Sequence, residues 1–197
     1  MKTHQHETLH IGIQGYKGSF NEQACMLYCE DHGMVDFSLQ YLYTTEKVLR
    51  ALSQGVIDFG IFAMSNSRSG IMMESLEAVS AYRFHVLDVF DMPVSYALLG
   101  KKGVSLDRIK KIISHPAILD ATREYLEATY GGKEISSGEG ILLDQAALSS
   151  HLAEAGSPSD IAVVAPAWSA DMYGLFVLDD HLENTESMTT FVWCKGR

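Results

Sequence analysis

The chain has 197 residues, of which 47% are hydrophobic and 20% are charged, as in an ordinary globular protein of one domain or two small lobes. Its formal net charge of -10 argues against binding to nucleic acid or to an anionic membrane surface. No apolar run is long enough to span a membrane, and the polar N-terminus does not resemble a signal peptide. Three cysteines, an odd number, favour a reducing compartment, so we expect a cytoplasmic protein.

The first predicted unit is a short buried strand over residues 9–14, followed by a glycine-rich turn and a helix. Gly18 permits a tight turn, and Ser19 with Glu22 three residues later predicts a capping box for a helix that continues to about Asp31. Such a turn directs free backbone N–H groups toward whatever lies above the strand. The dinucleotide-binding spacing G-x-G-x-x-G is missing, so a plain strand–helix connection and a ligand-binding turn both fit the pattern.

Cys25, Cys29 and His32 share one face of this predicted helix. Their spacing could suit a metal ion, but no fourth ligand is evident. Because cysteine is among the residue types most often buried, we expect core packing here and no metal site.

The apolar run 57–64 predicts a strand that is buried on both faces, followed by the polar segment 65–70 and then a helix. Open α/β sheets bind ligands where a strand ends and a helix begins, which makes Asn66 and Ser67 candidates for substrate binding. The alternative is simple capping of the next helix by Ser67 or Ser69.

Two extended stretches within residues 85–100, broken at Pro93, predict a long crossover strand and a change of lobe. A further strand leads to Ser114, His115 and Pro116, where the next helix begins, with Pro116 suited to its first turn. A histidine in such a place serves equally well as a structural cap or as a catalyst.

The order of predicted elements repeats within the chain. Residues 48–63 run through a helix, a glycine stop, an acidic residue and an apolar strand, and residues 147–165 do the same. We therefore expect an α/β fold with two similar lobes and a cleft between them. The first lobe is predicted to comprise about 8–84 plus 175–197, and the second about 85–174.

The final strand, predicted over residues 187–194, opens with the two adjacent hydroxyls of Thr189 and Thr190. On a strand these side chains point to opposite faces. Taken alone, this is a β-prone, half-buried strand without a functional assignment.

Together with four earlier stretches, this strand resembles the catalytic domain of prephenate dehydratases. The resemblance covers nearly the whole chain and rests on Gly15 to Ala24, the partial match Ala63 to Gly70, Ser114 to Leu119, Tyr173-Gly174-Leu175 and Thr189-Thr190-Phe191. It implies a two-lobed fold like that of type II periplasmic binding proteins, with prephenate in the cleft and no metal or organic cofactor. The regulatory ACT domain that often follows in the family is not expected, since the chain stops at Arg197.

The resemblance also implies a set of site residues. Those expected to bind substrate are Gly18, Ser19, Asn66, Ser67, Arg68, Gly70, Ser114 and Phe191, and those expected to act in catalysis are Thr189, Thr190 and His115. In the family, the threonine matched by Thr189 is credited with donating to the departing C4 hydroxyl. The family arginine is replaced here by Thr190 and the family glutamate by Ser65, and Arg68 is our candidate for the missing positive charge.

These departures favour the prephenate decarboxylases of secondary metabolism, including antibiotic biosynthesis, which resemble dehydratases but lack an intact Thr-Arg-Phe. Such enzymes expel carbon dioxide and keep the C4 hydroxyl, giving a non-aromatic dihydro-4-hydroxyphenylpyruvate. The alternative, indicated by Thr189 and Phe191, is a prephenate dehydratase of phenylalanine biosynthesis, an aromatic amino acid pathway. A non-catalytic protein that binds a small anion is the third hypothesis. A homodimer is the default oligomeric state.

Overall fold

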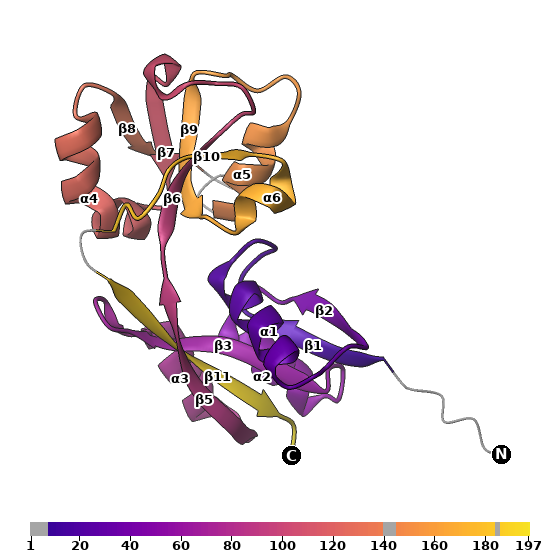
Figure 1. Ribbon diagram of the computed structural model, residues 1–197. Helices are drawn as coiled ribbons and strands as arrows, with labels where there is room; N and C mark the ends of the chain where they lie inside the picture. Colours follow the sequence, from indigo (N-terminus) through magenta and orange to yellow (C-terminus); the bar gives the residue numbers. More distant parts are fainter. Residues whose placement is uncertain (1–7, 140–144, 184–185) are drawn as a thin grey trace. The chain divides into compact units, whose positions relative to one another are not determined.

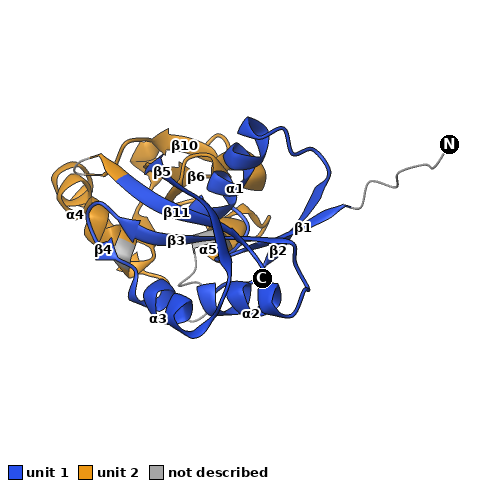
Figure 2. Ribbon diagram, turned by 90° about the horizontal axis from the view of Figure 1, so that it is seen from below, with its two compact units in different colours: residues 1–93, 188–197 blue, residues 94–187 orange. Residues whose placement is uncertain are grey.

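A computed structural model describes residues 8–139, 145–183 and 186–197. The chain divides into two compact units, each with its own sheet: unit 1 comprises residues 1–93 and 188–197, and unit 2 comprises residues 94–187 (Figure 2). The chain passes from one unit to the other after residues 93 and 187. Both points lie later in the chain than the predicted lobe boundaries, which were at about residues 84 and 174. The reason is that β5 (His85–Val94) belongs to the sheet of unit 1, whereas β10 (Phe176–Asp179) pairs with a strand of unit 2.

The sheet of unit 1 has the strand order β2-β1-β3-β11-β5 (Figure 1). Its strands are β1 (Leu9–Ile13), β2 (Phe37–Tyr41), β3 (Phe59–Asn66), β5 and β11 (Ser187–Lys195), with the short β4 (Gly70–Ile71) paired to β3. β1 is parallel to β2 and β3, and β11 is antiparallel to β3. The last strand therefore returns to the first unit, as the sequence predicts.

Three helices accompany this sheet: α1 (Phe20–Asp31), α2 (Thr45–Ser53) and α3 (Met73–Ala81). The predicted cap of α1 is confirmed, because the Ser19 hydroxyl accepts a hydrogen bond from the Glu22 N–H at 3.3 Å. Capping of the next helix by Ser67 or Ser69 is wrong: α3 begins only at Met73, without a side-chain cap. The chain first doubles back through β4, so these serines lie in a β-turn instead.

The two central strands of unit 1 send alternate side chains to opposite faces. Phe62 and Val192 pack among Val48 and Leu52 of α2, whereas the ring of Trp193 stacks on Tyr28 of α1 with centroids 4.5 Å apart. Alternation thus gives the sheet a core on each face, and Trp193 is among the largest fully buried side chains.

The sheet of unit 2 has the same arrangement as that of unit 1 when its order is read in the opposite direction. It runs β10-β6-β9-β7-β8, so that β8, β7, β9, β6 and β10 correspond to β2, β1, β3, β11 and β5. Its strands are β6 (Tyr96–Gly100), β7 (Lys111–Ser114), β8 (Glu134–Ser137), β9 (Ile161–Pro166) and β10. β7 is parallel to both of its neighbours, β8 and β9, just as β1 is parallel to β2 and β3. β6 is antiparallel to β9, just as β11 is antiparallel to β3. The predicted α/β fold with two similar halves is confirmed.

The helices of unit 2 are α4 (Pro116–Tyr130), α5 (Gln145–Ala153) and α6 (Ser169–Tyr173), with a 3-10 turn at Leu106–Arg108. The sequence predicts a helix over residues 141–154, and the start of this prediction lies outside the described residues. The sequence also predicts that Pro166 begins a last short helix ending at Gly174, but Pro166 is instead the final residue of β9. Gly174 does end α6, with the left-handed φ of 65° that glycine favours. Within the described part of the chain, no helix combines the length and apolarity needed to cross a bilayer.

Candidate active site

The polar residues of the last strand lie directly beside those at the end of β3. In the antiparallel register, Thr189 stands opposite Asn66 and Thr190 opposite Ser65, with a register shift immediately after Thr190. The two positions at which the sequence departs from the Thr-Arg-Phe and glutamate pattern are therefore cross-strand neighbours. This pairing is not predictable from local sequence patterns, because more than a hundred residues separate the strands.

Asn66 organises this corner with both ends of its amide. Its Nδ2 donates to Thr189 Oγ1 at 2.9 Å, and its Oδ1 accepts from the N–H groups of Arg68 at 2.9 Å and Ser69 at 3.3 Å. Thr189 is buried, with 5% of its surface exposed. Within residues 8–139, 145–183 and 186–197 no group is recorded as accepting the Thr189 hydroxyl hydrogen. Because its oxygen already accepts from Asn66, this hydroxyl is oriented to act as a donor.

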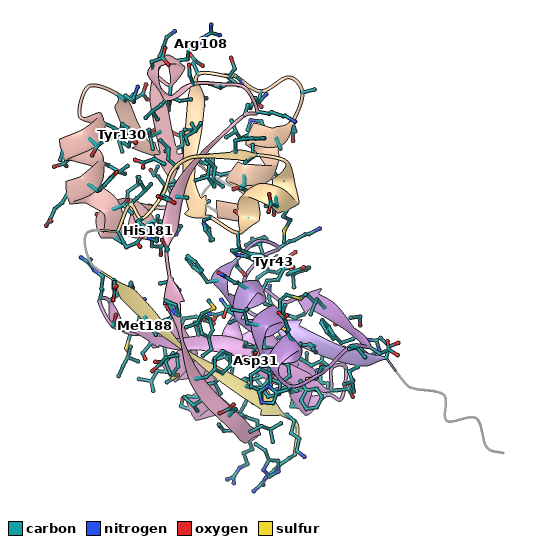
Figure 3. All side chains as sticks on the ribbon, in the orientation of Figure 1. Asp31, Tyr43, Arg108, Tyr130, His181 and Met188 are labelled. Carbon is teal, nitrogen blue, oxygen red and sulfur yellow. The ribbon has the colours of Figure 1, made fainter. Side chains whose placement is uncertain are left out.

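The loop after Asn66 is tied to the start of β11. The Ser67 N–H donates to the Met188 carbonyl at 2.8 Å, and the Met188 N–H donates to the Ser67 hydroxyl at 3.0 Å. Figure 3 labels Met188 at this end of the strand. Arg68 is exposed, and Gly70 has a left-handed φ of 78° where the chain turns into β4. The predicted residues of this loop thus lie close to Thr189.

Thr190 is held by a residue that the sequence analysis missed. Its hydroxyl donates to Asp91 Oδ1 of β5 at 2.6 Å. A carboxylate therefore lies beside the position at which the resemblance expects a guanidinium. The sequence feature that could have indicated Asp91 is weak: Asp88 and Asp91 interrupt a mostly apolar predicted strand. Phe191, the next residue, is fully buried and stacks near Phe90 with centroids 5.9 Å apart, so its ring belongs to the core.

The turn after β1 is occupied by its own side chains. The buried carboxylate of Glu22 accepts from the Gly18 N–H at 2.6 Å and from the Tyr41 hydroxyl at 2.7 Å. The Ser19 N–H donates to the Tyr16 carbonyl at 3.2 Å. The expectation of free N–H groups at Gly18 and Ser19 is therefore wrong here, because Glu22 and the local turn satisfy both.

A second hydrogen-bonded group lies at the carboxyl ends of β1 and β3. Gln14 accepts from the Ala63 N–H at 2.9 Å and donates to Glu74 Oε2 at 2.8 Å. Glu74 also accepts from the Thr45 N–H at 2.8 Å, so it caps α2 from the first turn of α3. The sequence analysis did not single out Gln14 or Glu74, whose partners are far away in the chain.

Ser114 and His115 lie in unit 2. Ser114 is fully buried, and its hydroxyl donates to the Val164 carbonyl at 2.7 Å. His115 is exposed, and its carbonyl accepts from the N–H groups of Ile118 and Leu119 at the start of α4. The structure thus shows a structural use for the backbone of His115 and for the Ser114 side chain.

Cys25 and Cys29 are buried, as the packing interpretation predicts, but His32 is exposed and stacks on Tyr28 with centroids 3.9 Å apart. A hydrogen bond with the Cys29 thiol, together with burial, holds the pKa of Cys25 far above its usual value. In the part of the chain that the structure describes, no three histidine, cysteine or acidic side chains form a group suited to a metal ion.

The sequence model of the prephenate dehydratase family matches residues 11–195. The chain belongs to the prephenate dehydratase family. The predicted resemblance is thereby confirmed for the fold and the family.

Curated relatives of the family are distant. A prephenate dehydratase of Lactococcus lactis is 26% identical over 95% of this chain and 63% of its own length. An arogenate dehydratase/prephenate dehydratase of Arabidopsis thaliana is 24% identical over 91% of this chain and 43% of its own. The chain thus spans less than half the length of that plant relative. A solved prephenate dehydratase of Arthrobacter aurescens has the same fold, with a TM-score of 0.81, 20% identity, and coverage of 96% of this chain and 61% of that one.

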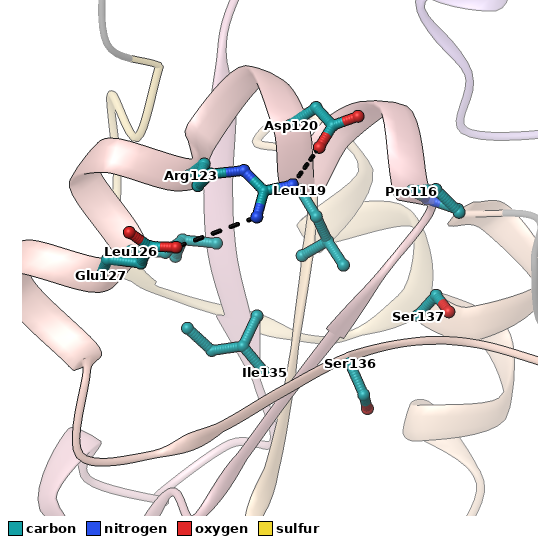
Figure 4. Close-up of a pocket in the computed structure, with 9 residues that line it drawn as sticks. All are labelled: Pro116, Leu119, Asp120, Arg123, Leu126, Glu127, Ile135, Ser136 and Ser137. Atoms are coloured by element: carbon teal, nitrogen blue, oxygen red, sulfur yellow. Dashed lines mark hydrogen bonds and ion pairs between the residues drawn. The ribbon is translucent and has the colours of Figure 1, made fainter.

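A pocket of about 320 Å³ in unit 2 includes Pro116 and Leu119 of the matched stretch Ser114 to Leu119, but none of the predicted site residues is in its lining. It is lined by Pro116, Leu119, Asp120, Arg123, Leu126, Glu127, Ile135, Ser136 and Ser137 (Figure 4). Arg123 is paired with both Asp120 and Glu127, so its charge is compensated within α4. This pocket therefore offers little to a dianionic substrate.

Proposed function

We propose that the chain is a prephenate-family lyase that removes carbon dioxide and the C4 hydroxyl together, leaving an aromatic product. The Thr189 hydroxyl carries this proposal. Its oxygen accepts from Asn66 Nδ2 at 2.9 Å, which leaves its hydrogen for an acceptor on the substrate. A donor at the C4 oxygen stabilises the negative charge that develops as this group leaves.

The bonds and electrons balance without a cofactor. The C–C bond to the ring carboxylate breaks, and its electron pair enters the ring as carbon dioxide departs. The C4–O bond breaks at the other end of the diene, and the oxygen leaves as water once it has gained a proton. Aromatisation supplies the driving force, so the protein has only to orient the substrate and assist the leaving oxygen.

The paired positions of Ser65 and Thr190 also support retention of the family reaction. A glutamate and an arginine at these cross-strand positions would face each other as an opposite-charge pair. Replacing both by hydroxyl residues removes one positive and one negative charge. The net charge at this corner is therefore unchanged by the two departures considered together.

Decarboxylation with retention of the C4 hydroxyl is the second candidate, and the contact between Thr190 and Asp91 favours it. Asp91 places a carboxylate 2.6 Å from the Thr190 hydroxyl, where a guanidinium is expected in the family. A negative charge on the strand next to β11 would make it less favourable for the C4 oxygen to leave as an anion. The ring would then be protonated at carbon after loss of carbon dioxide.

The deciding experiment is incubation of the pure protein with prephenate, and separately with arogenate, because relatives are named for both substrates. Products are identified by mass and ultraviolet spectra before any acid is added, since acid alone aromatises prephenate. Enzyme-dependent phenylpyruvate or phenylalanine supports the dehydratase. A product that has lost carbon dioxide but kept the hydroxyl supports the decarboxylase. Tight binding without turnover would leave the small-anion-binding hypothesis.

A further inference from the structure

The loops of unit 1 gather at the edge of its sheet where the parallel strands end. β1 is parallel to both β2 and β3, so the residues that follow these strands lie at one edge. Tyr16 follows β1, Tyr43 follows β2, and Asn66 ends β3. Open sheets of parallel strands bind ligands at this edge. Tyr16 and Tyr43 therefore belong to the same edge as the Thr189 hydroxyl, which Asn66 orients.

Tyr43 has a backbone conformation that a bulky residue rarely adopts. Its φ is 68°, in the left-handed region that favours glycine. Its carbonyl accepts from the Gly15 N–H at 3.0 Å, which ties the loop after β2 to the loop after β1. The residue is 45% exposed, so this strain does not serve core packing; Figure 3 labels Tyr43 in its loop. Strained residues of this kind are concentrated at ligand sites.

A positive charge lies against the Tyr43 ring. The Lys47 Nζ is 5.3 Å from the ring centroid, within the range of a cation–π contact. The Tyr16 ring packs on the same residue, with centroids 4.3 Å apart. The Thr44 hydroxyl accepts from the Lys47 N–H at 3.3 Å, which fixes Lys47 in the first turn of α2. Lys47 takes part in none of the ion pairs among the described residues.

An anionic substrate at this edge needs its positive charge from a side chain. The N–H groups of Gly18 and Ser19 are used by Glu22 and by the local turn. The arginine expected from the family is Thr190, whose hydroxyl contacts the Asp91 carboxylate. Lys47 supplies a cation that neither the turn nor the last strand offers.

We infer that Lys47, supported by the rings of Tyr16 and Tyr43, binds the side-chain 2-oxo carboxylate of the substrate. The proposed function, on which this inference rests, places the C4 oxygen at Thr189 and therefore both carboxylates at the far end of the ring. The ring carboxylate leaves as neutral carbon dioxide, so a cation bound to it would stabilise the substrate more than the transition state. The side-chain carboxylate keeps its charge throughout the reaction, which makes it the matching partner of Lys47.

This contact makes the site select the 2-oxo acid prephenate over the 2-amino acid arogenate. In arogenate an ammonium group sits on the carbon next to the side-chain carboxylate. The charge of Lys47 repels that ammonium, whereas the keto oxygen of prephenate carries no positive charge.

Equilibrium titration with two unreactive probes tests the site without turnover. Phenylpyruvate carries the 2-oxo side chain and phenylalanine the 2-amino one, and calorimetry measures the affinity of each. The unmodified protein should bind phenylpyruvate about tenfold more tightly than phenylalanine. Lys47→Met should weaken phenylpyruvate binding about tenfold and change phenylalanine binding little, whereas Lys47→Arg should keep most of the affinity. Lys195→Met makes the same charge change at the opposite edge of the sheet, beside the start of β3, and should have no effect.

Tyr43→Gly separates binding from folding. Glycine adopts the φ of 68° without strain, so the melting temperature should change little. Loss of the ring beneath Lys47 should still weaken phenylpyruvate binding about threefold or more. Phenylpyruvate that does not bind the unmodified protein, or that binds Lys47→Met and Lys195→Met equally well, would overturn the inference.

Steady-state kinetics distinguishes this inference from the proposed function. Lys47→Met should raise KM for prephenate about tenfold with little change in kcat, and should lower the ratio of kcat/KM for prephenate to that for arogenate. If the aromatic product forms and Lys47→Met matches the unmodified protein in KM and in phenylpyruvate affinity, the inference fails and the proposed function stands. If the hydroxyl is retained or turnover is absent, while Lys47→Met still weakens phenylpyruvate binding, the proposed function fails and the Lys47 site stands.

Discussion

The amide of Asn66 donates a 2.9 Å hydrogen bond to the hydroxyl of Thr189, joining the end of β3 to the start of β11. The same amide fixes the following loop through the N–H groups of Arg68 and Ser69. One side chain therefore sets both the direction of the Thr189 hydroxyl and the path of the loop beside it. The proposed chemistry depends on this relationship, and the first predictions address it.

Removal of the Thr189 hydroxyl should abolish assistance to the leaving oxygen. Thr189→Val keeps the shape of the side chain, and we expect kcat to fall about 10²- to 10⁴-fold with a small change in KM. Thr189→Ser keeps the hydroxyl and should retain most of the activity. Steady-state kinetics on prephenate measures both variants. Equal loss in the two would show that packing of the methyl group matters, and not the donor.

Asn66→Asp separates the two tasks of this amide. The substituted carboxylate can still accept from the Arg68 and Ser69 N–H groups, but it cannot donate to Thr189. It would accept the Thr189 hydroxyl hydrogen and withdraw it from the substrate. We expect a kcat loss close to that of Thr189→Val, with an unchanged melting temperature. Full activity in this variant would contradict the proposed orientation of the hydroxyl.

Asp91→Asn tests whether the carboxylate beside Thr190 opposes binding of an anionic substrate. Removing one negative charge near the site should lower KM about two- to fivefold, an effect of roughly 0.5–1 kcal/mol. Asp88→Asn on the same strand is the control for a change in net charge. If the product shifts from the hydroxyl-retaining compound to the aromatic one, Asp91 sets the outcome. The same KM for Asp91→Asn and the unmodified protein would exclude this electrostatic role.

Glu22→Gln should destabilise the turn after β1. The two carboxylate oxygens accept from the Gly18 N–H and from the Tyr41 hydroxyl in a buried site. The amide of glutamine has only one oxygen, so it can accept from only one of these two donors in the same way. We expect the free energy of unfolding to fall by about 1.5–3 kcal/mol, measured by urea denaturation. Glu30→Gln, at an exposed position of the same helix, should change it little. An equal effect of the two would argue against Glu22 as the organiser of this turn.

Tyr96 should make stability depend on alkaline pH. Burial, with a smaller contribution from the Glu183 carboxylate, raises the pKa of Tyr96 from 10.0 to about 12. The folded state therefore keeps this proton when the unfolded chain loses it. The stabilisation from the neutral phenol is present below pH 10 and is lost, at about 1.4 kcal/mol per pH unit, as pH rises from 10 toward 12.

Tyr96→Phe should flatten this dependence, as shown by urea titrations at a series of alkaline pH values. Tyr43→Phe, at a tyrosine that is 45% exposed, is the control and should leave the slope in place. If the unmodified protein and Tyr96→Phe lose stability in parallel above pH 10, another group is responsible.

Much of the local structure followed from short-range patterns. The Ser19 cap of α1 and the glycine stop at Gly174 are set by neighbours within a few residues, and these predictions were confirmed. The prediction of a half-buried final strand was wrong, because Phe191 to Cys194 of β11 are all buried and the sheet has a core on each face. The repeated order of helix, glycine, acidic residue and strand predicted two similar halves, and the equal strand orders of the two sheets confirm it. The motifs were likewise sufficient to identify the family.

Only the tertiary structure decided which groups meet at the candidate site. The pairing of Ser65 with Thr190, the contact of Asp91 with Thr190 and the use of the Gly18 N–H by Glu22 were not foreseen. Register between strands that are distant in sequence depends on the packing of the whole sheet. A buried N–H takes whichever acceptor the fold brings within reach. Local sequence patterns determine the secondary structure of each segment and the polar groups that it carries. The pairing of distant segments determines which of these groups form hydrogen bonds with one another.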